Sequence, residues 1–225
     1  MICERLHSLF NSLMRHAFPF EENLIPASGI YILFERGEHA HDGLDRIVRV
    51  GTHTRLGNLK QRLAEHFLIE NKDRSIFRKN IGRAILNQRK DPFLPQWEMD
   101  RTTRAARQRL AGQINSKQLA EIEAQVSSVI RASFTFCVIR VDDSQYRLEL
   151  EERIIATVNQ CLICRPSRNW LGNHSPKNQI RESGLWLVQG LNGRGMRPED
   201  LMYLDKENGA VKQWRAPYFE PGRRA

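Results

Sequence analysis

The fold is decided by the stretch Ser28-Gly29-Ile30-Tyr31-Ile32-Leu33-Phe34. Its β-branched and aromatic residues predict a strand that begins after a turn. The polar residues 35–43 predict a hairpin loop, and Ile47-Val48-Arg49-Val50-Gly51 predicts the returning strand. A tyrosine on a strand beside a turn can belong to the core or to a site, so Tyr31 alone does not assign a function.

A helix is predicted directly after this hairpin. Asn58 can cap it, and Gln61 three residues later completes a capping box. Its apolar residues recur at helical spacing, at Leu59, Leu63 and Phe67. A second helix is predicted over residues 75–88.

Two polar residues of the first predicted helix share one face, because Arg62 and His66 are four positions apart. The face lies beside the apolar stripe, at the edge of the core. An arginine there can reach a phosphate with its planar, permanently charged guanidinium. A solvated helix face is the alternative interpretation.

The strongest single signal is Glu151. A third strand is predicted over residues 132–141 and a helix over about 145–160. On that helix Glu151 falls within an inward apolar stripe formed by Leu148, Ile154, Ile155 and Val158. A carboxylate on an apolar face is unfavourable unless a cation or hydrogen-bond donors meet it. A divalent metal would do so, and an ion pair with a buried arginine is the alternative.

The remaining pattern indicates more helices. They are expected over residues 1–18, over 101–132 with a break near 112–116, from 175 to a stop at Gly184, and over 198–204. The predicted fold class is α/β (α+β), with a small three-stranded, mostly antiparallel sheet flanked by helices. No repeat or low-complexity linker divides the chain.

Charge indicates a polyanionic partner. The chain has 35 Lys and Arg against 26 Asp and Glu, and residues 46–109 hold 16 of the basic and 6 of the acidic residues. Clustered cations suit nucleic acid, because each neutralised phosphate releases counterions. A basic surface kept for solubility is the alternative. No apolar run approaches the length of a membrane span, so a soluble, cytoplasmic protein without a membrane partner is expected.

Four cysteines are too few for a disulfide scaffold at this length and suit a reducing compartment. Cys161 and Cys164 form a single CxxC. Zinc needs four ligands, and beyond the nearby His174 none is evident, so two ordinary half-buried cysteines are the favoured interpretation. The segment His39-Ala40-His41-Asp42 is expected to be a flexible solvated loop rather than a metal cluster.

Five short motifs together resemble the GIY-YIG nuclease superfamily. In chain order they are Gly29-Ile30-Tyr31, Arg49-Val50-Gly51, Arg62 with His66, Glu151 with Ile154 and Ile155, and Asn169 after Pro166. One departure is Arg49, which stands where the family has a tyrosine. The resemblance covers roughly residues 25–170.

The resemblance implies a division of the chain. Residues 25–174 would form the catalytic domain, with a helical insertion at about 93–132 that a minimal domain lacks. Residues 1–24 would be an N-terminal helix packed on this core. Residues 175–225 would be a C-terminal helical extension of the same compact unit.

The resemblance also implies a chemistry and a set of site residues. Glu151 would hold one Mg²⁺ or Mn²⁺ per active site, Arg62 would stabilise the phosphate, and Tyr31 would activate water. The expected catalytic residues are Tyr31, Arg49, His53, Arg62, His66, Glu151 and Asn169. The expected nucleic-acid contacts are Arg55, Lys60, Arg74, Arg78, Lys79 and Arg83.

The implied function is a divalent-metal-dependent DNA endonuclease, in a role such as restriction, repair or defence. Two alternatives remain at this point. One is a catalytically degenerate nucleic-acid-binding module on the same fold, which the Arg49 replacement motivates. The other is a nuclease directed at RNA.

Overall fold

One antiparallel sheet forms the centre of the molecule. The computed structural model describes residues 1–54 and 57–212, with the side chains of 207–212 left aside. The strands are β1 (His16–Ala17), β2 (Gly29–Ala40), β3 (Leu44–Gly51) and β4 (Phe134–Arg140), in the spatial order β1-β4-β2-β3 with every neighbouring pair antiparallel. The predicted mixed fold with a flanked antiparallel sheet is confirmed, but the described sheet has four strands rather than three.

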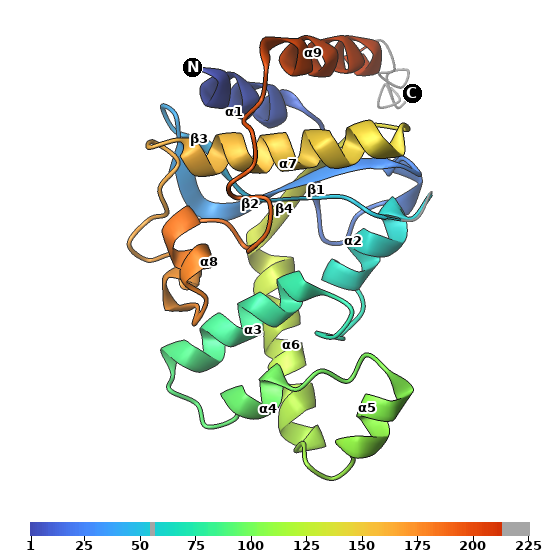
Figure 1. The fold of residues 1–225 in the computed structure, drawn as a ribbon, viewed down its shortest axis with the longest axis vertical. Helices are drawn as coiled ribbons and strands as arrows, with labels where there is room; N and C mark the ends of the chain where they lie inside the picture. The colour runs from blue at the N-terminus through green and yellow to red at the C-terminus, as the bar shows by residue number, and fades with distance from the viewer. Residues whose placement is uncertain (55–56, 213–225) are drawn as a thin grey trace, which may run out of the picture.

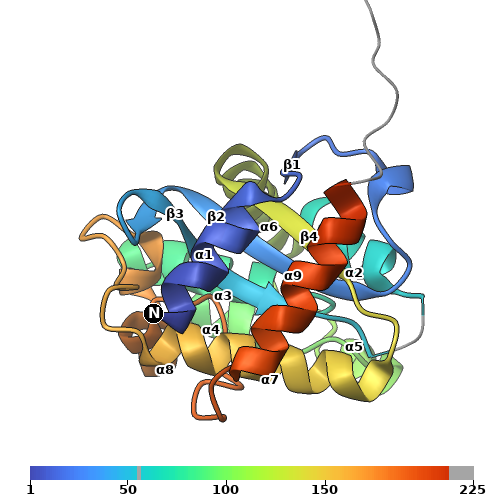
Figure 2. The same ribbon diagram turned by 90° about the horizontal axis from the view of Figure 1, so that it is seen from above.

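Helices cover both faces of the sheet. Figures 1 and 2 show α1 (Ile2–Ser12), α7 (Ser144–Gln160) and α9 (Pro198–Lys212) on one side. On the other side lie α2 (Leu59–Phe67), α3 (Ile76–Gln88) and α6 (Ser116–Ser133) (Figure 1). The sheet separates two hydrophobic cores. Alternate residues of β2 pack into one core or the other, because successive side chains of a strand point to opposite faces. Ile30 and Ile32 face α7, whereas Tyr31 and Leu33 face α2 and α3.

The shorter elements complete the chain. Helices α4 (Leu94–Glu98) and α5 (Arg104–Arg109) lie with one end of α6 below the sheet in Figure 1. The predicted break near residues 112–116 falls between α5 and α6. The remaining elements are the 3-10 turns η1 (Glu22–Leu24) and η2 (Leu171–His174), and α8 (Asn178–Ser183). As predicted, α8 ends at Gly184, whose φ of 70° is left-handed.

Several boundaries differ from the prediction. The first helix stops at Ser12 rather than near residue 18, and His16 and Ala17 pair with β4 instead. Strand β2 continues to Ala40, so residues 35–40 are strand and not loop. In both cases pairing with a distant strand decides the structure, rather than the local sequence pattern. A strand of two residues is also too short to show a periodicity.

Two other predictions about side chains need correction. On α7, Leu148 is 46% exposed, whereas Arg147 and Leu150 face the core beside Ile154. The segment predicted as a solvated loop contains His41, which is buried. Among the helices that the structure describes, none is long and apolar enough to cross a membrane.

Candidate active site

A chain of hydrogen bonds links β2, α2 and α3 beneath the sheet. The Tyr31 hydroxyl lies 2.8 Å from His66 Nε2, and His66 Nδ1 lies 2.7 Å from Ser75 Oγ. Ser75 also caps α3 by accepting from the backbone N–H of Arg78. Tyr31, His66 and Ser75 are each fully buried, so the chain is fixed by packing.

The imidazole of His66 is neutral in this setting. Burial is the main cause that holds the pKa of His66 well below its usual value, and the charges of Arg62, Arg49 and Arg78 lower it further. A neutral imidazole whose Nδ1 donates to Ser75 presents Nε2 as an acceptor. His66 Nε2 can therefore accept a hydrogen bond from the Tyr31 hydroxyl.

The glycines of the first two motifs allow this close packing. Tyr31 on β2 lies directly opposite Gly51 on β3. A Cβ at residue 51 would lie 2.2 Å from the Tyr31 hydroxyl oxygen. A Cβ at Gly29 would lie 2.1 Å from the carbonyl oxygen of Ile139. These positions need glycine for space, because no side chain fits there.

Arg49 lies beside the phenol. Its Nε donates to the Tyr31 hydroxyl oxygen over 3.4 Å, and its Nη1 donates to the carbonyl oxygen of Trp186. The side chain is buried. Arg49 therefore brings a fixed positive charge to the position where the family has a second tyrosine.

Glu151 has the properties expected of a cation ligand. Burial raises its pKa, while Arg49, the backbone N–H of Thr52, Arg62 and Arg147 favour the ionised form. Within the described ranges 1–54 and 57–212, these arginines act on Glu151 without a direct ion pair. A single carboxylate with hydrogen-bonded surroundings suits Mg²⁺, which binds through few protein oxygens and keeps several waters.

Arg147 precedes Glu151 by one helical turn and was missed by the sequence interpretation. It is buried and donates to the carbonyl oxygens of Val141, Asp142 and His53. Its Nε has no partner in the described structure. The spacing of four residues from Glu151 is the signal that could have identified it.

A pocket of about 420 Å³ opens beside α2. It is lined by Thr52, His53, Thr54, Asn58, Gln61, Arg62 and Glu65. Arg62 Nη1 donates to Glu65 over 3.1 Å and to the carbonyl oxygen of Arg74 over 3.0 Å. Because the Arg62 side chain is 24% exposed and already oriented, it can meet an anion in the pocket.

The two other predicted residues differ in their placement. His53 lines the pocket, but its Nε2 accepts the backbone N–H of Gly29 over 3.2 Å. Asn169 is exposed and lines a different pocket of about 450 Å³, beside Glu35 and Trp170. The structure therefore brings Tyr31, Arg49 and His66 together and does not bring Asn169 to them.

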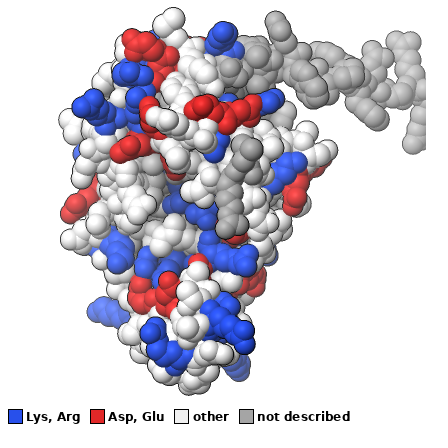
Figure 3. Space-filling model, turned by 45° about the vertical axis from the view of Figure 1, so that its right-hand side comes forward, with Lys and Arg blue, Asp and Glu red and all other residues white. Residues whose placement is uncertain are grey.

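Basic side chains gather across the middle and lower part of the face drawn in Figure 3. Helix α5 contributes the exposed residues Arg104, Arg107 and Arg109, which lie in the basic segment but were not predicted as contacts. Arg74 is exposed and Lys60 half-buried, so both can reach a partner. Arg55 lies outside the described residues.

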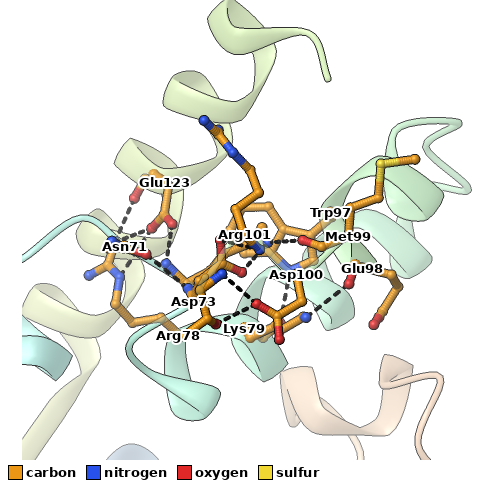
Figure 4. Close-up of polar contacts among 12 residues, drawn as sticks. Asn71, Asp73, Arg78, Lys79, Trp97, Glu98, Met99, Asp100, Arg101 and Glu123 are labelled. Atoms are coloured by element: carbon orange, nitrogen blue, oxygen red, sulfur yellow. Dashed lines mark hydrogen bonds and ion pairs between the residues drawn. The ribbon is translucent and has the colours of Figure 1, made fainter. Parts of the chain in front are cut away.

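Three of the predicted nucleic-acid contacts are structural instead. Figure 4 shows Arg78 against Glu123 of α6 and Lys79 against Glu98. Arg78 Nη2 lies 2.8 Å from the Glu123 carboxylate, and Lys79 Nζ donates to the carbonyl oxygen of Glu98 over 2.9 Å. Arg83 binds the Glu98 carboxylate with two hydrogen bonds, at 2.5 and 2.6 Å. Arg78 and Arg83 are buried, so their predicted contact with a nucleic-acid backbone is wrong.

The comparisons with known proteins agree with the motifs. A family model for the GIY-YIG domain matches residues 10–213. The curated proteins and the solved structures gave no match. The match spans every motif residue described above. The chain therefore belongs to the GIY-YIG nuclease superfamily.

Proposed function

We propose that this protein is a divalent-metal-dependent endonuclease that hydrolyses phosphodiester bonds in DNA. The observation that carries the proposal is Glu151, a half-buried carboxylate whose ionised form Arg49, Arg62 and Arg147 favour and which makes no direct ion pair with another described residue. The charge of Arg62, which lines the pocket beside α2, favours the ionised form of Glu151. A nuclease fold and a nucleic-acid substrate follow from the family; the metal and DNA belong to the proposal.

Glu151 would hold one Mg²⁺ or Mn²⁺, which when bound relieves negative charge on the scissile phosphate. Arg62 stabilises the charge that develops on the same phosphate, with its guanidinium already oriented by Glu65. Tyr31 is the proposed acceptor of the attacking water's proton, and a hydrogen bond to His66 Nε2 orients its hydroxyl. Ser75 holds the imidazole in the orientation that accepts it.

Arg49 supports this transfer from the other side of the phenol. Its guanidinium donates to the Tyr31 hydroxyl oxygen, so negative charge that develops there meets a fixed cation. Arg49, His66 and the close approach of Gly51 hold the Tyr31 hydroxyl in a fixed position. The family's second tyrosine is therefore replaced by an electrostatic aid rather than by another hydroxyl.

Roles in restriction, repair or defence against foreign DNA fit an enzyme with this chemistry. The basic face over α5, with Arg74 and Lys60, would contact the backbone and position the duplex without reading its sequence. An RNA substrate is the variant of this proposal, and matched DNA and RNA strands separate the two.

The test is cleavage of a panel of substrates with Mg²⁺ or Mn²⁺: duplex, single-stranded, branched and modified DNA, and RNA. We expect cutting of at least one DNA substrate, and loss of cutting in Glu151→Gln. Glu152→Gln is the matched control, because Glu152 is adjacent but exposed. Lack of cleavage on every substrate would contradict the proposal.

The second candidate is a binding module without catalysis, and the observation that favours it is the replacement at Arg49. This candidate predicts salt-sensitive DNA binding that needs no metal and is unchanged in Glu151→Gln. Binding of this kind without cleavage by the wild-type protein would favour it over the enzyme.

A further inference from the structure

We infer that Cys3, His41, Cys161 and Cys164 form a structural zinc site separate from the active site. Their ligand atoms all lie within 4.8 Å of one another. Three thiolates and one imidazole are one of the ligand sets that structural zinc uses. The favoured interpretation of Cys161 and Cys164 as ordinary cysteines is thereby replaced, because the missing ligands come from distant parts of the chain.

The distances fit a tetrahedral ion. Zn–S bonds of about 2.3 Å and Zn–N bonds of about 2.1 Å place two sulfurs about 3.8 Å apart, and a sulfur and a nitrogen about 3.6 Å apart. The sulfurs of Cys3 and Cys164 are 3.4 Å apart. His41 Nε2 is 3.2 Å from the Cys164 sulfur and 3.6 Å from the Cys161 sulfur. A disulfide would accommodate only two of these four groups, with sulfurs about 2.05 Å apart.

His41 is held in an unusual backbone conformation. It follows β2 in the turn to β3, and its φ of 44° is left-handed, as is the φ of 60° at Asp42. Such values are uncommon outside glycine and carry a cost that the surroundings must offset. The turn places the His41 imidazole among the three sulfurs, and coordination would offset that cost.

The neighbouring His7 serves a different purpose. Its Nε2 lies 3.2 Å from the backbone nitrogen of Ile47, which donates to it, and its Nδ1 lies 2.9 Å from the carbonyl oxygen of Cys3. Both ring nitrogens thus bond backbone groups at the shorter distance, while the sulfurs of Cys3 and Cys164 lie 3.7 Å from Nδ1 and Nε2. His7 packs against His41, with ring centroids 4.7 Å apart, and forms a wall of the site rather than a ligand.

Three segments lie side by side at this site, as Figures 1 and 2 show: the start of α1, the β2–β3 turn and the end of α7. Zinc would join them. Cys3 lies in the first turn of α1. Between the two cysteines of the CxxC, Leu162 and Ile163 are 78% and 49% exposed. Apolar burial therefore does not fix this loop, whereas two bonds to one ion would.

The position indicates a structural rather than a catalytic metal. Cys161 follows Glu151 by ten residues along α7, a rise of about 15 Å. Soft sulfur ligands select zinc over Mg²⁺, so the two sites would hold different ions. Fixing the end of α7 would also fix the helix that carries Glu151.

The first measurement is the metal content of the full-length chain, purified under reducing conditions without chelator. We expect about one Zn per chain, retained on dialysis, and its loss in Cys161→Ser and His41→Asn. The matched controls Cys137→Ala, a buried cysteine outside the cluster, and His39→Asn, on the same hairpin, should keep it. Glu151→Gln should keep it too, which separates this site from the active site.

A second measurement uses the wild-type protein alone, so it stays decisive if the ligand variants fail to fold. Zinc is removed from the wild-type protein with a chelator and Co²⁺ is added. Visible bands of tetrahedral, thiolate-bound cobalt and recovery of a Tm lowered by about 10 °C are expected. The inference is overturned if the wild-type chain contains no zinc and gives no such bands, if a ligand variant keeps its zinc, or if Cys3 and Cys164 form a disulfide.

Discussion

Replacing Gly51 with Ala is expected to displace the proposed proton acceptor without touching any charged group. The added Cβ would lie 2.2 Å from the hydroxyl oxygen of Tyr31 and 2.3 Å from its Cζ, where ordinary contact begins at 3.4 Å. The phenol must therefore move, and its 2.8 Å hydrogen bond to His66 is lost. The backbone of residue 51 needs no left-handed φ, so the clash is the only cost.

The magnitude follows from these contacts. Overpacking a tight site costs about 1–3 kcal/mol, and a hydrogen bond contributes about 1 kcal/mol. We expect Gly51→Ala to reduce the free energy of unfolding by about 2–4 kcal/mol. Misplacement of the phenol by about 1 Å should lower the cleavage rate about 100-fold.

Urea unfolding of four proteins tests this reasoning: wild type, Gly51→Ala, Tyr31→Ala and the double variant. Without the ring the added methyl group has room, so most of the cost of Gly51→Ala should vanish, with a coupling of about 2 kcal/mol. Gly195→Ala is a control, because its Cβ would meet only side-chain atoms at 3.3 and 3.5 Å. Equal destabilisation with and without the Tyr31 ring would refute the argument.

Three further predictions concern buried charges. Glu35 accepts from Trp170 and Trp186, and burial raises its pKa from 4.5 to about 6. The stabilisation from its protonated form is therefore lost as the pH rises. In urea unfolding, the free energy of unfolding of Glu35→Gln minus that of wild type should increase by about 2 kcal/mol between about pH 4 and pH 7.5. A difference that does not change with pH would contradict this. Arg78→Met should cost about 3–5 kcal/mol, because it leaves Glu123 buried and unpaired, and a change below 1 kcal/mol would refute the structural role. Because burial raises the pKa of Glu151, the Mg²⁺ concentration for half-maximal cleavage should rise as the pH is lowered, and a pH-independent value would argue against Glu151 as the ligand.

The parts of the fold that were predicted from sequence have strong local patterns. The strand at residues 29–34, its return at 47–51 and helices α2, α3 and α7 follow from apolar periodicity and β-branched runs. The pairing of Tyr31 with His66 was accessible because the helix of His66 directly follows the hairpin whose first strand carries Tyr31. Strand β1 was missed because two residues carry no period and depend on β4 for pairing.

The parts that were not predicted depend on distant partners. The sequence predicts Arg78 to be an exposed cation. In the structure it is buried and forms an ion pair with Glu123, which lies 45 residues later in the chain. Cys3 and Cys164 are 161 residues apart, so no spacing rule connects them. Glu65 was accessible in principle, since it follows Arg62 by three residues on the same helical face. Local patterns thus identified the candidate residues, and tertiary pairing decided which cations remain available.

The most direct test of the central claim separates chemistry from binding at Glu151. The single-turnover cleavage rate with saturating Mg²⁺ is measured for wild type and Glu151→Gln on a cleaved DNA substrate, together with the Kd of each protein for that DNA. We predict that the rate falls about 1,000-fold or more while the Kd changes less than about threefold, because the carboxylate acts on the bound phosphate through the cation. A Glu151→Gln protein that cleaves at the wild-type rate would contradict the account.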